Sequence, residues 1–144
     1  MSGFRTFLRS LNAYLSRMMS VKEKLQTAAT GLWMMSESDY PFDYLETTQT
    51  SHNPEIARQL AGREADAPVS PVSLDHLLRN MTDPASGSVS PDTAKKFVNL
   101  AQTLKSELRG LSVYRIGDVE VDVLILGKTG EGRIAGLKTR LIET

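Results

Sequence analysis

Carboxylates alternate with hydroxyl groups in one short stretch, Ser36-Glu37-Ser38-Asp39, which directly follows the large apolar residues 33–35. Carboxylates attract cations and basic side chains of a partner, and serine hydroxyls both donate and accept hydrogen bonds. The same residues also suit a helix exit, where serine side chains bond nearby backbone groups in a turn. The sequence therefore predicts either a partner-binding loop or a simple turn here, with residues 33–35 as core residues at a helix end.

A second group of carboxylates lies on a segment that alternates like a β-strand. Asp118, Glu120 and Asp122 are spaced two residues apart and alternate with valines, so they share one face. Three oxygen ligands on one face suit Mg²⁺. The solvent face of an amphipathic strand explains the same pattern, and we favour that interpretation.

Most catalytic and cofactor-binding equipment is missing from the sequence. The chain has no cysteine and only two histidines, His52 and His76, which are 24 residues apart in the sequence. The segment GKTGEG (residues 127–132) lacks the earlier glycine of a phosphate-binding loop, because Asp122 occupies that position. Its three glycines instead predict a hairpin turn. We interpret the chain as a non-enzymatic binding protein without a cofactor or a metal of its own.

The charge is distributed unevenly along the 144 residues, although the net charge is zero. Residues 1–22 contain four basic residues and no acid, whereas the remainder contains 13 basic and 17 acidic residues. An acidic body argues against direct binding of nucleic acid, which needs a basic surface. It suits a basic partner, because complementary charge speeds association.

The elements that position these residues can be predicted from hydrophobic spacing and capping residues. The spacing predicts a helix capped by Ser20, a strand over 42–48, a helix over 53–62, an edge strand near 67–73, a short helix over 73–81, and a long helix from Ser90 to Gly110. Residues 119–126 and 134–144 predict a β-hairpin at the end of the chain. These elements predict an α/β sandwich with a mixed sheet and a C-terminal antiparallel hairpin.

Residues 1–19 form a separate segment. They combine basic residues with an apolar stripe at helical spacing, which predicts an amphipathic helix. A helix docked on the body, an organelle-targeting peptide and a membrane-surface helix all fit this pattern. We expect an N-terminal extension over 1–19 and one domain over 20–144.

Two blocks of the chain resemble the signature regions of the nuclease A inhibitor family. They read LQTAATGLWMMSESDYPFDYL (residues 25–45) and VYRIGDVEVDVLILGKTGEGRIAGLKTRLIET (residues 113–144). The resemblance implies a three-layer α/β/α protein that blocks the active site of a non-specific, metal-dependent endonuclease of the ββα-metal class. It is weaker in the loop over 82–93, which has no aromatic residue and only Asp83 and Asp92 as acids, so the resemblance leaves contact through this loop, and retention of inhibition, open.

The resemblance also implies which residues contact the nuclease. The key glutamate of the family corresponds to Glu37, and its C-terminal carboxylate corresponds to Thr144, with Ser36, Ser38 and Asp39 beside them. Both carboxylates would approach the metal of the nuclease. We therefore expect a cytoplasmic nuclease inhibitor. The alternative is a non-enzymatic adaptor or membrane-directed domain that kept the inhibitor fold, and membrane contact by residues 1–19 is the less favoured interpretation.

Overall fold

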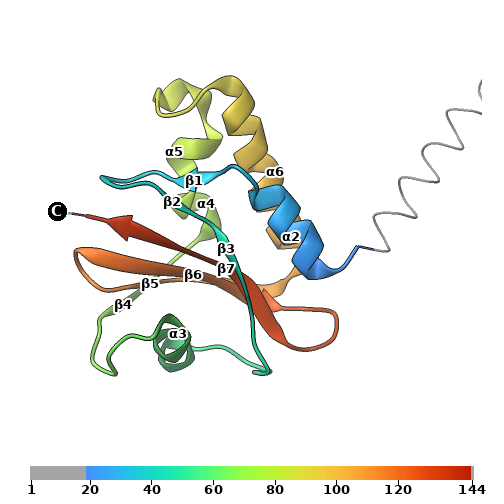
Figure 1. Cartoon of the computed structure of the whole chain (residues 1–144), viewed down its shortest axis with the longest axis vertical. Helices are drawn as coiled ribbons and strands as arrows, with labels where there is room; N and C mark the ends of the chain where they lie inside the picture. The colour runs from blue at the N-terminus through green and yellow to red at the C-terminus, as the bar shows by residue number, and fades with distance from the viewer. Residues whose placement is uncertain (1–18, 144) are drawn as a thin grey trace, which may run out of the picture.

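The computed structural model describes residues 19–143. Its centre is a five-stranded sheet in the spatial order β3 (Asp43–Glu46), β7 (Ile134–Ile142), β6 (Glu120–Lys128), β5 (Arg109–Ile116) and β4 (Val69–Val72) (Figure 1). The α/β class and the C-terminal antiparallel hairpin are confirmed. The sheet differs from the expected mixed sheet, because all four strand pairings are antiparallel. Strands β5, β6 and β7 follow one another through short turns, which only antiparallel neighbours allow.

Both faces of the sheet are covered. Helices α2 (Val21–Ala29) and α6 (Pro91–Glu107) lie on one face and α3 (Pro54–Ala61) lies on the other (Figure 1). The buried side chains divide accordingly into two clusters, a larger one that includes Phe97 of α6 and a smaller one that includes Ala57 of α3. This explains the continuous apolar run in the central strand β6, because a strand covered on both faces does not alternate.

The predicted helix starts are confirmed by their capping bonds. The side chain of Ser20 accepts a hydrogen bond from the Glu23 amide at 3.1 Å, and that of Asn53 accepts from the Ile56 amide at 2.9 Å. Ser90 caps α6 in the same way. Each cap satisfies a backbone donor that the first helical turn leaves unpaired. Helix starts are therefore encoded within three residues of sequence.

The middle of the chain agrees with the sequence in outline. Strand β4 lies at the edge of the sheet, as the prolines of the segment over 67–73 predict, because proline cannot donate to a neighbouring strand. The short helix after it is divided into α4 (Leu74–Leu77) and α5 (Arg79–Thr82). The polar loop that follows contains one short 3₁₀ helix, η1 (Pro84–Ser86).

Residues 33–35 are not three core residues at a helix end, as we expected. Helix α2 ends at Ala29, and the chain turns at Gly31, whose φ of 75° suits glycine. It then forms strand β1 (Trp33–Met34), in which neighbouring side chains point in opposite directions. Met34 is therefore buried, with 4% exposed, whereas 51% of Trp33 and 41% of Met35 are exposed.

Strand β5 was not predicted. Helix α6 ends at Glu107 and the strand begins at Arg109, two residues later. Gly110, which we expected to stop the helix, has a φ of 61° and lies where the register with β6 shifts between Arg109 and Ser112. A glycine at a bulge and a glycine after a helix look alike in a sequence.

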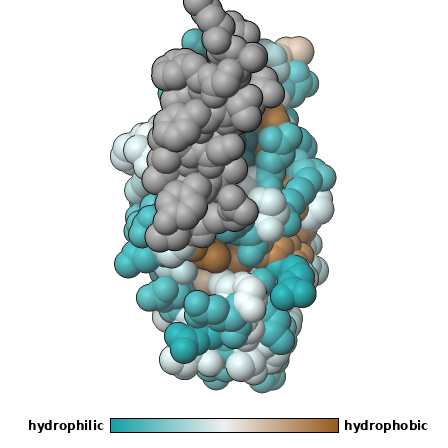
Figure 2. All heavy atoms as spheres, turned by 90° about the vertical axis from the view of Figure 1, so that its right-hand side faces the viewer, coloured by the Kyte–Doolittle hydropathy of each residue, from teal (hydrophilic) through white to brown (hydrophobic). Residues whose placement is uncertain are grey.

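The surface of the described part of the chain is mostly polar in the view of Figure 2. Hydrophilic residues prevail in the coloured part of this face, and hydrophobic residues appear there in limited areas. The large apolar side chains are instead buried between the sheet and its helices. This distribution is ordinary for a folded domain and makes the half-exposed Trp33 more informative.

Candidate partner-binding site

The Ser36–Asp39 stretch forms the turn of a two-stranded ribbon. Strand β1 pairs with β2 (Tyr40–Pro41), and the residues between them make the connection. The side chains of Glu37, Ser38 and Asp39 are exposed, whereas Ser36 is partly buried. The ribbon therefore presents two carboxylates and one hydroxyl to solvent.

The partly buried Ser36 joins this turn to the last strand of the sheet. Its hydroxyl donates to the backbone oxygen of Ser38 at 2.7 Å, as the simple-turn interpretation predicts. The hydroxyl oxygen of Ser36 also accepts a hydrogen bond from the backbone amide of Ile142 at 3.1 Å. One side chain thus shapes the loop and fixes it to the end of β7. Figure 1 shows the ribbon and the C-terminal end on the same side of the molecule.

A second attachment lies at Tyr40, the residue of β2 nearest the turn. The hydroxyl of Thr139 donates to the backbone oxygen of Tyr40 at 3.3 Å. The guanidinium of Arg140 lies 5.9 Å from the centre of the Tyr40 ring, within the range of a cation–π contact. Strand β7 therefore supports the ribbon both at its turn, through Ser36, and at β2, through Tyr40.

The end of the described chain is also held. The backbone amide of Glu143 donates to the backbone oxygen of Val119 at 2.8 Å. The carboxylate of Glu143 forms an ion pair with Arg115 of β5. Thr144 lies outside the described residues, so its predicted role is not tested by these contacts. Glu143, the residue before it, follows Ile142, whose backbone amide donates to the Ser36 hydroxyl.

The carboxylates at 118, 120 and 122 do not form one exposed face. Asp118 and Glu120 are exposed, but Asp122 is buried, with 1% exposed, and our solvent-face interpretation is wrong for this residue. The reason is that the second helical layer, with α3 and the segment after it, covers this face of β6. Within residues 19–143 there is no group of three side chains that could hold a metal ion.

Two arginines neutralise the buried Asp122. Arg63 contacts one carboxylate oxygen at 3.0 Å, and Arg140 contacts the other at 3.3 Å. The hydrogen bond to Asp122 raises the pKa of Arg63 above its usual value. The two ion pairs offset the cost of burying the Asp122 carboxylate. They also hold the guanidinium of Arg140, which contacts the Tyr40 ring. Asp122 is therefore a structural support of the ribbon.

The histidines also have separate surroundings. One ring nitrogen of His52 lies 2.6 Å from the Tyr114 hydroxyl and the other lies 2.8 Å from the backbone oxygen of Gly110. Both nitrogens thus hold the loop before α3 to strand β5. His76 is exposed on α4 and lines the cavity described next. Neither arrangement suggests catalysis.

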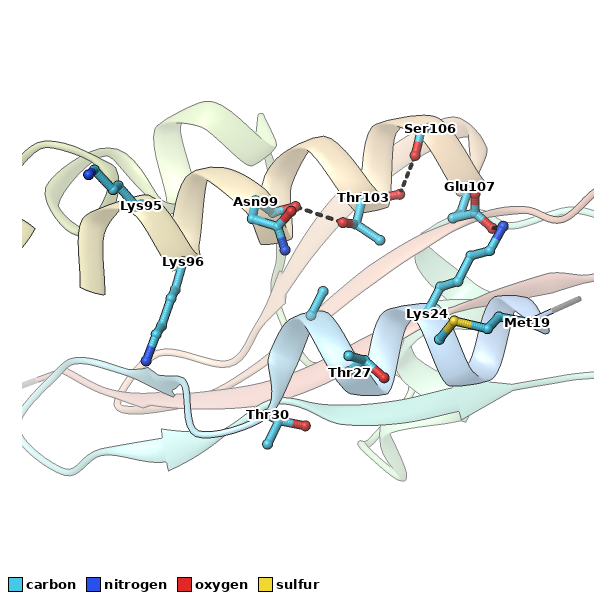
Figure 3. Close-up of a pocket in the computed structure, with 11 residues that line it drawn as sticks. Met19, Lys24, Thr27, Thr30, Lys95, Lys96, Asn99, Thr103, Ser106 and Glu107 are labelled. Atoms are coloured by element: carbon cyan, nitrogen blue, oxygen red, sulfur yellow. Dashed lines mark hydrogen bonds and ion pairs between the residues drawn. The ribbon is translucent and has the colours of Figure 1, made fainter. Parts of the chain in front are cut away.

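A cavity of about 470 Å³ lies beside the Ser36 loop. Its walls include Ser36 and Glu37 of the loop, His76 of α4, Arg115 of β5 and Glu143 at the end of the chain. A larger groove of about 770 Å³ lies between α2 and α6, where Lys24 pairs with Glu107 (Figure 3). None of the predicted partner-binding residues lines that groove, so the cavity beside the loop is the one that belongs to the candidate site.

A family model described as nuclease A inhibitor-like protein matches residues 19–144. The chain belongs to this family. A search of curated protein sequences finds no match to it. The suspected resemblance is thereby confirmed, and membership of the nuclease A inhibitor-like family points to a nuclease as the partner.

Residues 1–18 of this nuclease A inhibitor-like chain lie outside both the family match and the described residues. The three interpretations of the N-terminal segment and the division of the chain at residue 19 therefore stay predictions. Among the helices of residues 19–143, none is long and apolar enough to span a membrane.

The structure adds residues to the candidate site that sequence reasoning missed. Ile142, Thr139 and Arg115 support the loop and the chain end, although none had been singled out. No local signal could have identified them, because Ser36 and Ile142 are 106 residues apart in the sequence. Such contacts depend on the register of β7, which local patterns do not specify.

Proposed function

We propose that this protein inhibits a non-specific, metal-dependent endonuclease of the ββα-metal class by occluding its active site. The centre of the contact is the Ser36–Asp39 loop together with the terminal carboxylate of Thr144. The observation that carries this proposal is the hydrogen bond between the Ser36 hydroxyl and the Ile142 amide, at 3.1 Å. It brings the two parts of the chain that resemble the inhibitor family to one edge of the fold.

The chemistry of the two carboxylates suits such a target. A free α-carboxylate has a pKa near ~3.5 and is anionic at neutral pH. Mg²⁺ prefers hard oxygen ligands, so the Thr144 carboxylate would occupy the place of the scissile phosphate without offering a bond to cleave. Glu37 would accept hydrogen bonds from metal-bound water or a basic side chain. Any metal belongs to the nuclease, and this protein supplies no cofactor and no catalytic group.

The neighbouring polar residues would extend the contact. Ser38 and Asp39 are exposed beside Glu37. An acidic edge complements a nuclease surface built to attract nucleic acid, and this complementarity raises the association rate. The cytoplasmic location is part of the same proposal.

The exposed apolar residues Trp33 and Met35 would lie within the same contact area. A standard interface covers about 800 Å² on each partner, which corresponds to a radius of about 16 Å around the loop. Met35 and Trp33 precede Ser36 by one and three residues, and a strand rises about 3.4 Å per residue. Both side chains therefore lie close enough to be covered, and tryptophan is a frequent hot-spot residue.

The altered loop over 82–93 is not assigned to the contact. Asp83 accepts a hydrogen bond from the Ala85 amide at 2.9 Å and caps η1, and Asp92 lies in the first turn of α6. Both acids thus have local structural roles. The proposal rests on the ribbon and the chain end alone.

A plasmid-cleavage assay tests this function. A ββα-metal endonuclease at fixed Mg²⁺ is titrated with the parent protein, with Glu37→Gln, and with a form carrying one extra residue after Thr144. We expect stoichiometric inhibition by the parent and at least about a 30-fold loss in each variant, which corresponds to about 2 kcal/mol at a hot spot.

Glu131→Gln is the matched control, because Glu131 is an exposed acid in the turn at the opposite end of the β6–β7 hairpin. It should inhibit like the parent. If Glu37→Gln and the extended form inhibit as well as Glu131→Gln does, the proposed site is wrong.

Binding is measured separately from cleavage. The chain contains a single tryptophan, so protein labelled with 5-fluorotryptophan gives one fluorine resonance from Trp33. Its chemical shift should change when the nuclease is added, and the change should saturate at one equivalent. A shift that stays constant while inhibition occurs would place Trp33 outside the contact.

A further inference from the structure

The cavity beside the Ser36 loop is enclosed by three parts of the chain. Met34 of β1 contributes from the ribbon, and Leu141 of β7 contributes from the sheet. Leu77 of α4 and Met81 of α5 contribute from the helices above them. The volume of about 470 Å³ lies within the range of about 300–1,000 Å³ that is typical of ligand pockets. The candidate site therefore contains a hollow as well as an exposed loop.

Methionines are concentrated in the wall of this cavity. Three of the six methionines of the chain line it, namely Met34, Met35 and Met81. Met34 and Met81 are buried, which makes the inner wall apolar. Methionine side chains are flexible, adapt to the shape of an inserted group and make favourable sulfur contacts with aromatic rings. The inner wall therefore suits an aromatic ring.

The charged groups around the cavity balance one another. The described lining residues include two guanidiniums and two carboxylates, and His76 is counted as neutral: Arg79, Arg115, Glu37 and Glu143. A charged side chain in this cavity would face groups of its own sign as well as groups of the opposite sign. It would also lose hydration against the apolar inner wall, which is costly for an ion. The cavity therefore favours an uncharged occupant.

The guanidinium of Arg115 is not fully paired in the cavity wall. A guanidinium carries five N–H donors. One amino group of Arg115 binds the Glu143 carboxylate, whereas the buried Nε–H has no acceptor within residues 19–143. A buried donor without an acceptor is costly. Because this side chain lines the cavity and is 27% exposed, an occupant that carries a hydrogen-bond acceptor would find donors there.

We infer that the cavity binds one tyrosine-like side chain of the nuclease. The aromatic ring packs on Met34 and Met81, and the hydroxyl oxygen accepts a hydrogen bond from the guanidinium of Arg115. Tyrosine combines an apolar ring with a neutral acceptor, and it is enriched among the residues that dominate binding energy at interfaces. This inference rests on the proposed function. It adds an apolar anchor to a contact otherwise made through carboxylates.

The methionine methyl groups report whether the cavity is occupied in the complex. In protein with isotopically labelled methionine methyl groups, the resonances of Met34 and Met81 should shift when the nuclease is added and should saturate at one equivalent. Met19, which lines the groove between α2 and α6, is the internal control and should keep its resonance. Stoichiometric inhibition with unchanged Met34 and Met81 resonances overturns the inference and leaves the proposed function intact.

A titration without the nuclease separates this inference from the proposed function. The probe is N-acetyl-L-tyrosinamide, which is neutral and should shift the Met34 and Met81 resonances at concentrations at which N-acetyl-L-alaninamide has no effect. N-acetyl-L-phenylalaninamide lacks the hydroxyl and should bind about fivefold more weakly. Equal affinity of the two aromatic compounds overturns the role of Arg115, and no shift with either refutes the aromatic site.

A variant that fills the cavity tests the same anchor in the cleavage assay. Asn80 is exposed on α5 and lines the cavity, so the indole of Asn80→Trp should occupy it and weaken inhibition about tenfold. Asn99→Trp is the matched control, because Asn99 is an exposed asparagine of α6 that lines the other groove. Equal inhibition by the two variants contradicts the inference. If the nuclease is neither bound nor inhibited while the tyrosine compound shifts Met34 and Met81, the proposed function has failed and only the nuclease as the source of the side chain is refuted.

Discussion

The hydroxyl oxygen of Ser36 accepts a hydrogen bond from the backbone amide of Ile142 at 3.1 Å, across 106 residues of sequence. The serine lies at the tip of the β1–β2 ribbon and the isoleucine at the end of the last strand. A ribbon of two short strands is only marginally stable by itself. This bond, together with that between Thr139 and Tyr40, therefore gives the exposed Glu37 a defined position.

Ser36→Ala should weaken both the fold and inhibition. The substitution leaves the Ile142 amide without its acceptor and removes the bond to the Ser38 oxygen. We expect a loss of about 1–2 kcal/mol in the free energy of unfolding, measured by urea denaturation. Inhibition should fall by more than this stability loss explains, because Glu37 is no longer held.

Ser38→Ala is the control for this prediction. Ser38 is exposed, and its backbone oxygen, which the substitution keeps, makes the bond to Ser36. Its free energy of unfolding should stay within about 0.5 kcal/mol of the parent. Equal free energies of unfolding of the two alanine variants would mean that the Ser36 bonds do not stabilise the loop.

Asp122→Asn should destabilise the fold by about 3 kcal/mol. The substitution leaves Arg63 and Arg140 facing a neutral group inside the sheet, and breaking a buried ion pair typically costs about 3–5 kcal/mol. Both arginines are partly exposed and can be solvated, which places the expected loss near the lower value. Asp118→Asn, at an exposed site on the same segment, should be nearly neutral.

A comparison of the parent with Asp122→Asn also distinguishes a structural role of Asp122 from metal binding. Because both of its oxygens face arginines, adding Mg²⁺ should leave the melting temperature of the parent unchanged. A rise with Mg²⁺ in the parent that disappears in Asp122→Asn would restore the metal-site interpretation. Differential scanning fluorimetry over a Mg²⁺ series is sufficient for this comparison.

Tyr44 should make the fold sensitive to high pH. Burial, followed by the charge of Glu46, raises the pKa of Tyr44 from 10.0 to about 12. A folded-state pKa above the unfolded value means that the unfolded chain releases its proton first, so stability is full below pH 10 and is lost as the pH rises toward 12. The slope should be below about 1.4 kcal/mol per pH unit, because Tyr44 is only partly buried.

Tyr44→Phe isolates this contribution from the lysines that titrate in the same range. Above pH 10, we expect the free energy of unfolding of the parent to fall relative to that of Tyr44→Phe, because only the parent carries the tyrosine with a raised pKa. Urea denaturation at pH 9.0, 10.0 and 11.0 measures it. Parallel stability curves for the two proteins would show that the tyrosine pKa is not raised in the folded state.

Local signals predicted the parts of the fold that local bonds create. The caps at Ser20, Asn53 and Ser90 each join residues three apart, so a sequence motif is sufficient to identify them. The turn between β6 and β7 is encoded in the same way by glycines within a few residues. The acidic residues of the loop were also recognisable, since their residue type by itself gives their charge.

Burial and partnership of side chains, in contrast, depended on how distant segments pack. Asp122 and Glu120 occupy equivalent positions in an alternating pattern, yet one is buried between two arginines and the other is exposed. Arg63, from a segment after α3, binds the side-chain carboxylate of Asp122, whereas at Glu120 it binds the backbone oxygen and the side chain stays exposed. Local patterns thus predicted an α/β chain with a C-terminal hairpin, and the resemblance of two sequence blocks predicted the family that the family match confirms. The pairing of Ser36 with Ile142 and of Arg115 with Glu143 follows from strand register, which is set by long-range packing rather than by neighbouring residues.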